Sequence, residues 1–298
     1  MLLQRSHGGF EKAKTYCERA LEIEKNLRDN EFVRVADTIN DLGVCLSNFK
    51  DEKKATSSYK KALKLTESVY HESHPYKAIT LRNIGVSLSK LRENETAKKY
   101  FEKALTISET GNDQSNIQLV LNDLGSCLIE LKEYDKAKAY YDRALSIYEK
   151  GDDENDSRLS TTLENLGFCH NELKQHKKAK VYLERALSIR EKGDNENDPQ
   201  LASTLNNLWF CHNELKEYDK EKVYLEKALS IHEKGDNNDP QLASTLEILA
   251  IFYIELKEYS KAKEHLDRAL SICEKEDNKN DSQLDTTLNN MLVSASMN

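Results

Sequence analysis

The chain has almost none of the residues that interrupt helices and no long apolar segment. Only three of its 298 residues are proline, which suits a succession of helices. No apolar run approaches the roughly 20 residues needed to span a bilayer. The N-terminal stretch MLLQRSHGGFEKAK has too short an apolar part for a signal peptide. We therefore expect no membrane insertion, and we expect a cytoplasmic protein.

An excess of basic residues is also missing. The chain holds 44 Lys and Arg against 52 Asp and Glu, a net charge of −8, which argues against nucleic acid or an anionic membrane as the main partner. There is no P-loop, no glycine-rich dinucleotide turn and no Gly-x-Ser-x-Gly elbow. Acidic and basic residues lie at solvent positions of the expected helices, so we expect a protein that is not an enzyme.

Metal-binding patterns are absent as well. Cys169 and His170 are adjacent in sequence, as are Cys211 and His212, whereas zinc ligands on one helix face need a spacing of three or four. The acidic loops at 152–156 and 194–198 lack the glycine and glutamate of an EF-hand. We expect no metal and no cofactor.

What the chain does contain is a repeat of 40 to 42 residues. The dipeptide Ala-Leu marks it, and its leucines are Leu21, Leu63, Leu105, Leu145, Leu187, Leu229 and Leu270. A fixed period of this length indicates stacked supersecondary units, each unable to bury its apolar face alone. Such arrays present long surfaces rather than a catalytic cavity.

One copy, residues 198–239, predicts an antiparallel helical hairpin. Asp198 is the expected N-cap with Pro199 at the first helical position. Apolar residues at helical spacing predict a first helix that ends near Lys216, and a second helix follows a short turn. Gly235 is expected to close that helix at its C′ position. Gly151 and Gly193 hold the same place in other copies.

Within each hairpin, a glycine is followed at fixed offsets by alanine, a bulky residue and alanine. The copies are Gly43-Ala55-Tyr59-Ala62, Gly85-Ala97-Phe101-Ala104, Gly125-Ala137-Tyr141-Ala144 and Gly167-Ala179-Leu183-Ala186. This pattern resembles the tetratricopeptide repeat, whose small-large-small residues let two helices nest. The strings HESHPYKAITLRNIG, TLNNL and ALSIxEK resemble the kinesin light chain and nephrocystin-3 branch of that family. The resemblance covers essentially the whole chain and implies an all-α, right-handed superhelical solenoid of antiparallel helix hairpins.

We expect a single array over residues 1–298. It comprises a half repeat at 1–31, full repeats at about 32–73, 74–115, 116–156, 157–198, 199–239 and 240–281, and a terminal half repeat at 282–298. The uncapped C-terminal half repeat has two explanations. Either the chain is an excerpt of a longer protein, or its ends pair with something.

Two copies depart from the pattern, because Trp209 and Ala250 replace the glycine, and Glu221 replaces the first alanine of its copy. Trp209 is the one tryptophan of the chain. It is either a bulky filler between helices or a residue that faces a ligand. Four cysteines share one position, two residues after the glycine, and are expected to be core thiols too far apart for disulfides: Cys45, Cys127, Cys169 and Cys211.

In tetratricopeptide arrays the first helix of each hairpin lines the concave face. The resemblance therefore implies a peptide groove, and its candidate residues here are Asn40, Asn83, Asn122, Asn165, Phe168, Asn171, Asn207, Phe210 and Asn213. Carboxamides donate to and accept from a peptide backbone, and the two phenylalanines offer flat apolar platforms. Alternatively, the asparagines recur only through duplication, and the phenylalanines are buried.

The charge of the expected groove bears on its partner. Its positions are mostly acidic, including Asp41, Asp123, Glu164 and Glu214 against Arg82 and Lys90, which favours a neutral or basic peptide. We expect an interaction scaffold that binds an extended peptide or partner segment. The alternative is a cargo or regulatory region of a larger kinesin-light-chain-like or nucleotide-binding protein. The sequence does not indicate the oligomeric state.

Overall fold

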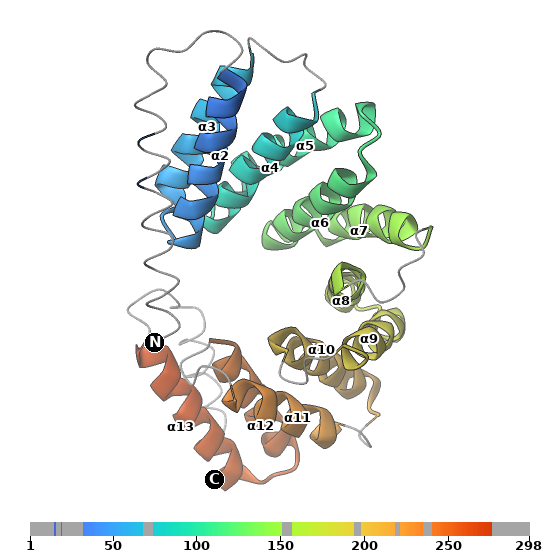
Figure 1. The fold of residues 1–298 in the computed structure, drawn as a ribbon. Coiled ribbons are helices and arrows are strands. Elements are labelled where there is room, and N and C mark those ends of the chain that lie inside the picture. The colour runs from blue at the N-terminus through green and yellow to red at the C-terminus, as the bar shows by residue number, and fades with distance from the viewer. Residues whose placement is uncertain are drawn as a thin grey trace. The chain divides into compact units, whose positions relative to one another are not determined.

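The computed structural model describes residues 15, 19, 32–67, 74–150, 157–193, 198–217, 221–234 and 240–275. All regular secondary structure within these ranges is α-helical and falls into hairpins of a first and a second helix (Figure 1). The earlier hairpins are α2 (Phe32–Asn48) with α3 (Glu52–Glu67), α4 (Pro75–Lys90) with α5 (Asn94–Thr110), and α6 (Gln114–Glu130) with α7 (Tyr134–Tyr148). The later hairpins are α8 (Ser157–Glu172) with α9 (His176–Glu191), α10 (Pro199–Leu215) with α11 (Glu221–Glu233), and α12 (Pro240–Glu255) with α13 (Tyr259–Lys275).

The hairpins stack in chain order within two compact units. Unit 1 spans Met1–Asp152 and unit 2 spans Asp153–Asn298. Inside each unit, a first helix packs against the second helix of its own hairpin, and that second helix packs against the first helix of the next. The predicted all-α solenoid of antiparallel hairpins is therefore confirmed. The predicted half repeats 1–31 and 282–298 lie outside the described residues, apart from residues 15 and 19.

The small-large-small pattern brings the two helices of a hairpin into close contact. A Cβ atom added to Gly125 would lie 2.5 Å from the ring of Tyr141, and one added to Gly167 would lie 2.5 Å from Leu183. The flanking alanines are fully buried: Ala55, Ala62, Ala97, Ala104, Ala137, Ala144, Ala179 and Ala186. The large residue of the second helix thus occupies the space that the missing glycine side chain leaves.

In the hairpin of α10 and α11 a large residue, Trp209, stands at the position that glycine holds in other hairpins. Trp209 is 3% exposed and packs with Leu225, which holds the bulky position of α11, and with Leu249 and Phe252 of α12. Its indole N–H has no acceptor among the described residues, which costs about 1–3 kcal/mol. Of the two roles considered for Trp209, the structure shows the core filler. Ala250 is also buried and packs with Leu266 of α13.

The turn inside each described hairpin places a non-glycine residue in the left-handed region. The six residues are Lys50, Arg92, Lys132, Lys174, Lys216 and Lys257, with φ between 56° and 62°. The next residue then closes the helix end, as where the Glu133 N–H donates to the Leu128 carbonyl at 2.8 Å. No described glycine has positive φ. Gly193 follows Lys192, the C-cap of α9, and so lies at the predicted C′ position, although its φ is not positive. Gly151 and Gly235 lie outside the described residues.

The predicted helix start at Asp198 and Pro199 is confirmed. Asp198 caps α10 by accepting from the Gln200 N–H at 3.0 Å. His74 caps α4 in the same way, because its Nδ1 accepts from the Tyr76 N–H at 3.2 Å. In both helices proline follows the cap at the first helical position, where its missing N–H costs nothing.

The recurring cysteines are free thiols within the hairpins. Cys127, Cys169 and Cys211 are buried, as predicted, and Cys45 is half-buried. Burial raises the pKa of the Cys211 thiol to about 11. This thiol is therefore protonated at neutral pH and acts as a small core residue.

Unit 2 carries a histidine–tyrosine ring pair in each hairpin. His170 of α8 stacks on Tyr182 of α9, with ring centroids 5.3 Å apart, and His212 of α10 contacts Tyr224 of α11. In the last hairpin the two residue types exchange places, and Tyr253 stacks on His265 at 5.4 Å. The contact survives the exchange because either ring can supply the same flat surface.

We expect the protein to lose stability in mild acid, because the imidazole of His265 is partly buried. Burial lowers the pKa of its imidazole below the ordinary 6.5. Below about pH 6.5 the imidazole therefore binds a proton more readily in the unfolded chain than in the folded chain. The contribution of His265 to the free energy of unfolding is complete above that pH and falls as the pH drops through it. Urea titrations at pH 7 and pH 5.5 should show a larger loss in the wild type than in His265→Tyr, which carries the residue found at position 224. An equal loss in both proteins would contradict this role.

Candidate partner-binding surface

Helical spacing places several predicted binding residues on one face of each first helix in unit 2. Positions two before, one after and five after the glycine position are separated by three and four residues, so they share a face. We call this set, with the asparagine of α10 beside it, the first-helix face of unit 2. Its members are Asn165, Phe168, Glu172, Asn207, Phe210, Asn213, Glu214, Ile248, Ile251 and Glu255.

In unit 1 the predicted asparagines are half-buried and bond within the array. The Asn83 Nδ2 donates to Asn40 Oδ1 at 3.2 Å, which links α4 to α2. The Asn122 Nδ2 donates to the Gln118 carbonyl at 3.0 Å in its own helix. Their carboxamides join neighbouring turns and hairpins rather than lying open along a face.

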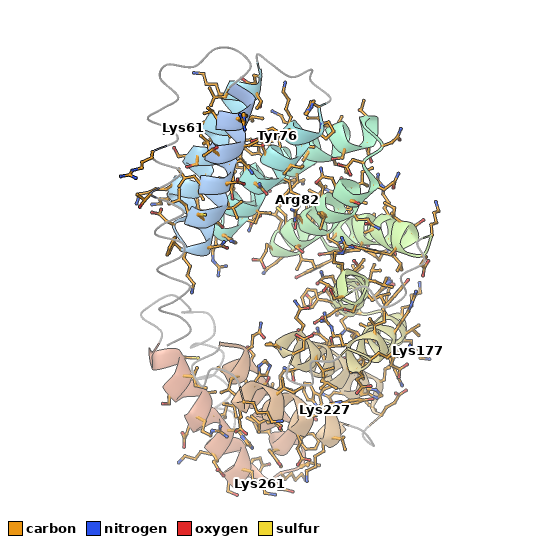
Figure 2. The ribbon with its side chains drawn as sticks, viewed as in Figure 1. Lys61, Tyr76, Arg82, Lys177, Lys227 and Lys261 are labelled. Atoms are coloured by element: carbon orange, nitrogen blue, oxygen red, sulfur yellow. The ribbon has the colours of Figure 1, made fainter. Side chains whose placement is uncertain are left out.

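The charges on the first helices of unit 1 are largely paired. Arg82 of α4, labelled in Figure 2, forms an ion pair with Asp123 of α6. Lys90 lies 3.0 Å from Glu52, measured from Nζ to Oε1. Burial and the neighbouring Asp37 raise the pKa of the Asp41 carboxyl. The first helices of unit 1 therefore carry no strong excess of positive or negative charge.

In unit 2 the two predicted phenylalanines are accessible. Phe210 is 39% exposed, and its ring contacts the imidazole of His176 edge to face at 5.9 Å. Phe168, one hairpin earlier, is half-buried. Asn165 and Asn207 are also half-buried, and the Asn213 Nδ2 donates to Glu255 Oε1 at 3.2 Å. The structure thus brings these predicted residues together on one surface.

Asn171 is a correction to the predicted set. It is 5% exposed, and its Oδ1 lies 3.0 Å from the Cys211 thiol and 3.2 Å from His176 Nδ1. The side chain turns toward α10 because the thiol and the imidazole satisfy its oxygen there. Asn171 is a buried link between hairpins and does not face a ligand.

Glu164 is a second correction, because it does not offer an open negative charge. It is 8% exposed, and its Oε2 lies 2.8 Å from Nη2 of the buried Arg190. Its carboxylate also accepts from Ser203 Oγ at 2.6 Å. Nη1 of Arg190 donates to Gln200 Oε1 at 2.7 Å. This buried ion pair joins α8, α9 and the start of α10.

Sequence reasoning missed Arg190, although a signal was present. It fills the variable place of the ALSIxEK string, which holds Tyr148 in α7, His232 in α11 and Cys273 in α13. Arg190 is the cation of this series, and it faces Glu164 across its own hairpin. In this copy an acidic residue in the first helix, Glu164, accompanies the basic residue in the ALSIxEK string, Arg190. Comparing these two positions across the copies would have suggested the ion pair.

Acidic and basic residues of unit 2 lie on different helices. The described first helices α8, α10 and α12 contain five glutamates and one cation, Arg158. The second helices carry most of the other cations, among them Lys177, Lys227 and Lys261 (Figure 2). The turns that follow the first helices add Lys174, Lys216 and Lys257. Several cations of the second helices pair with an acid of the adjacent second helix, such as Lys227 with Glu191 at 2.7 Å. The first-helix face is therefore acidic on balance.

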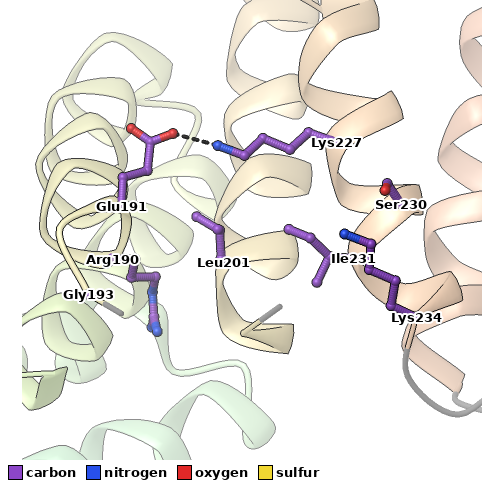
Figure 3. A pocket seen from close by; sticks show the side chains of 8 residues that line it. All are labelled: Arg190, Glu191, Gly193, Leu201, Lys227, Ser230, Ile231 and Lys234. Carbon is purple, nitrogen blue, oxygen red and sulfur yellow. Dashed lines mark hydrogen bonds and ion pairs between the residues drawn. The ribbon is translucent and has the colours of Figure 1, made fainter. Parts of the chain in front are cut away.

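A cavity of about 420 Å³ lies elsewhere in unit 2, where α9 and α11 end and α10 begins (Figure 3). Leu201 and Ile231 form part of its lining, and the Glu191–Lys227 ion pair crosses one side. A similar cavity in unit 1 is lined by Ile117 and Arg143, at the equivalent place between hairpins. Because it recurs with the repeat, it follows from hairpin packing and does not mark a particular ligand.

Two other kinds of site were sought among the described residues. No three histidine, cysteine, aspartate or glutamate side chains there are grouped to hold a metal ion. Within the same residues, no helix has the length and apolar character needed to cross a membrane.

A family model for the tetratricopeptide repeat matches the sequence at residues 34–110, 116–192, 158–234 and 200–275. These matches cover well over half of the chain. The chain belongs to the tetratricopeptide repeat family. Its glycine–tyrosine contacts, such as Gly125 against Tyr141, are the nesting contacts that the sequence resemblance implied.

Solved structures share this tetratricopeptide fold at low sequence identity. BtubC (BKLC) from P. vanneervenii is 20% identical, with a TM-score of 0.64 over 78% of this chain and 92% of that one. A putative kinesin light chain of P. anserina with nearly identical repeats is 14% identical, with a TM-score of 0.58 over 68% and 97%. A Rap protein complexed with competence and sporulation factor is 16% identical, with a TM-score of 0.59 over 96% and 82%. No curated protein matches the chain.

Proposed function

We propose that the chain is a protein-interaction scaffold that binds an extended segment of a partner along the first-helix face of unit 2. The exposure of Phe210 carries this proposal. A phenylalanine with 39% of its surface in solvent loses that contact with water when a partner covers it. It lies beside Asn207 and Asn213, whose amides both donate and accept. An apolar platform with polar groups around it is the usual composition of an interface.

The family supports a binding role rather than catalysis. Tetratricopeptide arrays are generally scaffolds, and a Rap protein of the same fold has been solved in a complex with competence and sporulation factor. The described cysteines are free thiols, which is usual in reducing compartments and supports the cytoplasm as the proposed location. Neither nucleic acid nor a membrane forms part of the proposed partnership.

We expect the double variant Phe168→Ala, Phe210→Ala to lose partners that the wild type recovers in a pull-down. Aromatic residues in the centre of an interface typically contribute about 2 kcal/mol or more each, so binding should weaken by at least tenfold. The matched control is Val181→Ala, Val223→Ala, which removes two apolar side chains, 63% and 64% exposed, from the second helices α9 and α11.

Partners should bind the control variant as they bind the wild type. If the phenylalanine variant recovers the same partners in the same amounts, the first-helix face is not the binding surface. Loss of binding only in the valine variant would move the interface to the second helices.

A further inference from the structure

Phe210, whose exposure carries the proposed function, lies against a side chain of the preceding hairpin. The imidazole of His176, the first residue of α9, contacts the Phe210 ring with the two centroids 5.9 Å apart and the two planes at 63°. This edge-to-face geometry is favourable because the edge of an aromatic ring is partly positive and its face partly negative. The imidazole therefore supports one side of the Phe210 ring.

His176 is itself held on both of its ring nitrogens. Its Nδ1 lies 3.2 Å from Asn171 Oδ1 in α8. An amide oxygen can only accept, so Nδ1 carries a proton and donates to it. On the other side of the ring, Nε2 is 3.8 Å from Oε2 of Glu214 in α10, and only 16% of the His176 side chain is exposed. The imidazole thus cannot turn away from Phe210 without losing its bond to Asn171.

Asn171 is held in turn by α10. Its Oδ1 also accepts from the Cys211 thiol at 3.0 Å, and Cys211 directly follows Phe210 in the sequence. The path of contacts therefore begins on α10 at Cys211 and runs through the buried Asn171 to His176. It returns to α10 at Phe210. This closed path fixes the phenyl ring relative to the backbone of its own helix.

A restrained aromatic ring favours binding. A partner that covers a freely rotating side chain must order it, and the lost rotamer freedom weakens the affinity. Phe210 is 39% exposed, so it offers contact area to a partner. Because His176 already restrains the ring from one side, less rotamer freedom is lost when a partner binds.

The residue equivalent to His176 differs in the other described hairpins. It begins the second helix, three residues before the first alanine of the repeat pattern, and is Glu52 in α3, Asn94 in α5, Tyr134 in α7 and Tyr259 in α13. The hairpin therefore does not require histidine at this place. Asparagine and tyrosine are both compatible with it, and they remove or keep an aromatic ring.

Resting on the proposed function, we infer that His176 is a positioning residue for partner binding. It holds the Phe210 ring in the orientation that the partner contacts, and it acts through Phe210 rather than by touching the partner. Asn171 belongs to the same support, because it fixes the imidazole from α8.

The first test observes the Phe210 position directly by fluorine NMR. Trifluoromethylphenylalanine replaces Phe210 in the full chain, with His176 unchanged, with His176→Asn or with His176→Tyr. Asparagine keeps an amide donor near the place of Nδ1 but removes the ring. Its resonance should move toward that of the free amino acid and narrow about twofold, because the side chain gains freedom. With tyrosine, which keeps a ring, about half or more of the original displacement should remain.

The second test measures the partners that are lost from the Phe168→Ala, Phe210→Ala variant in the pull-down. The His176→Asn variant should recover about a third of the wild-type amount or less, and His176→Tyr should stay within about twofold of the wild type. The control is Lys177→Asn, which makes the same replacement at the adjacent exposed residue and should match the wild type. Fluorescence of the buried Trp209 verifies that unit 2 is folded in each variant.

An unchanged fluorine resonance in His176→Asn would overturn the inference, and so would an equal loss of partners in His176→Asn and His176→Tyr. If the partners depend on the phenylalanines but His176→Asn recovers them fully, the inference fails and the proposed function stands. If no partner depends on the phenylalanines, both fail.

Discussion

Replacing Arg190 by methionine should lower the free energy of unfolding by about 3–5 kcal/mol, the usual cost of removing one partner of a buried ion pair. The side chain of Arg190 is 3% exposed and that of Glu164 is 11% exposed. Without the guanidinium, Glu164 keeps hydroxyl donors from Ser203 and Thr204 but no opposite charge. The same change also removes the bond from Arg190 to Asp198, the N-cap of α10.

The single tryptophan makes this effect measurable within unit 2. Trp209 is buried in α10, so its fluorescence in a urea titration reports the unfolding of that hairpin. The double variant Arg190→Met, Glu164→Gln should recover most of the loss, because it leaves no buried charge. Lys178→Met, at an exposed position of the same helix, should change stability by less than about 0.5 kcal/mol. A loss below 1 kcal/mol in Arg190→Met would show that the buried pair does not stabilise the hairpin junction.

The second large effect is expected at Gly125, where valine should lower the free energy of unfolding of unit 1 by about 3 kcal/mol. Overpacking of a filled core typically costs 1–3 kcal/mol. Here the cost should be at the upper end, because the added Cβ would lie 2.5 Å from the Tyr141 ring. That ring cannot move freely, since the Tyr141 hydroxyl is 2.9 Å from Ser126 Oγ and the side chain is fully buried.

A double-mutant cycle separates this clash from the general cost of valine in a helix. Tyr141→Ala alone should cost about 3–5 kcal/mol through the cavity that it leaves. Combined with Gly125→Val, it should cost less than the sum by at least 1 kcal/mol, because the valine enters the vacated space. Ala139→Val, at an exposed position of α7, supplies the helix-propensity control. Additive losses in circular-dichroism melts would mean that Gly125 and Tyr141 do not share a contact.

The fold was predictable because its determinants lie close together in sequence. The cap at Asp198 and Pro199 acts over a few residues, and the contact of Gly125 with Tyr141 spans a single hairpin. Periodicity therefore locates helices, turns and the nesting contact without further information. The left-handed turn residues, five lysines and Arg92, were not predicted, because glycine is the residue usually expected at positive φ. Their conformation follows from the tight turn between the two helices of a hairpin.

The binding surface was harder to predict, because its details depend on contacts between hairpins. Phe210 of α10 and Asn171 of α8 both lie in first helices, and each was predicted to face a ligand. Phe210 is exposed, whereas Asn171 is drawn inward by Cys211 of the next hairpin. Glu164 was counted as an open charge, and Arg190 neutralises it. Sequence periodicity gives the face on which a residue lies, but a neighbour of the right chemistry decides whether it stays accessible.

The most direct measurement for the proposed scaffold is photo-crosslinking from defined positions. A photoreactive phenylalanine analogue would replace Phe210 on α10 in one protein and Val223 on α11 in another, both exposed in the structure, and each full chain would be irradiated with cell extract. We predict that the partners recovered by the wild type crosslink at position 210 and not at position 223. Crosslinking at position 223 without crosslinking at position 210 would contradict binding on the first-helix face.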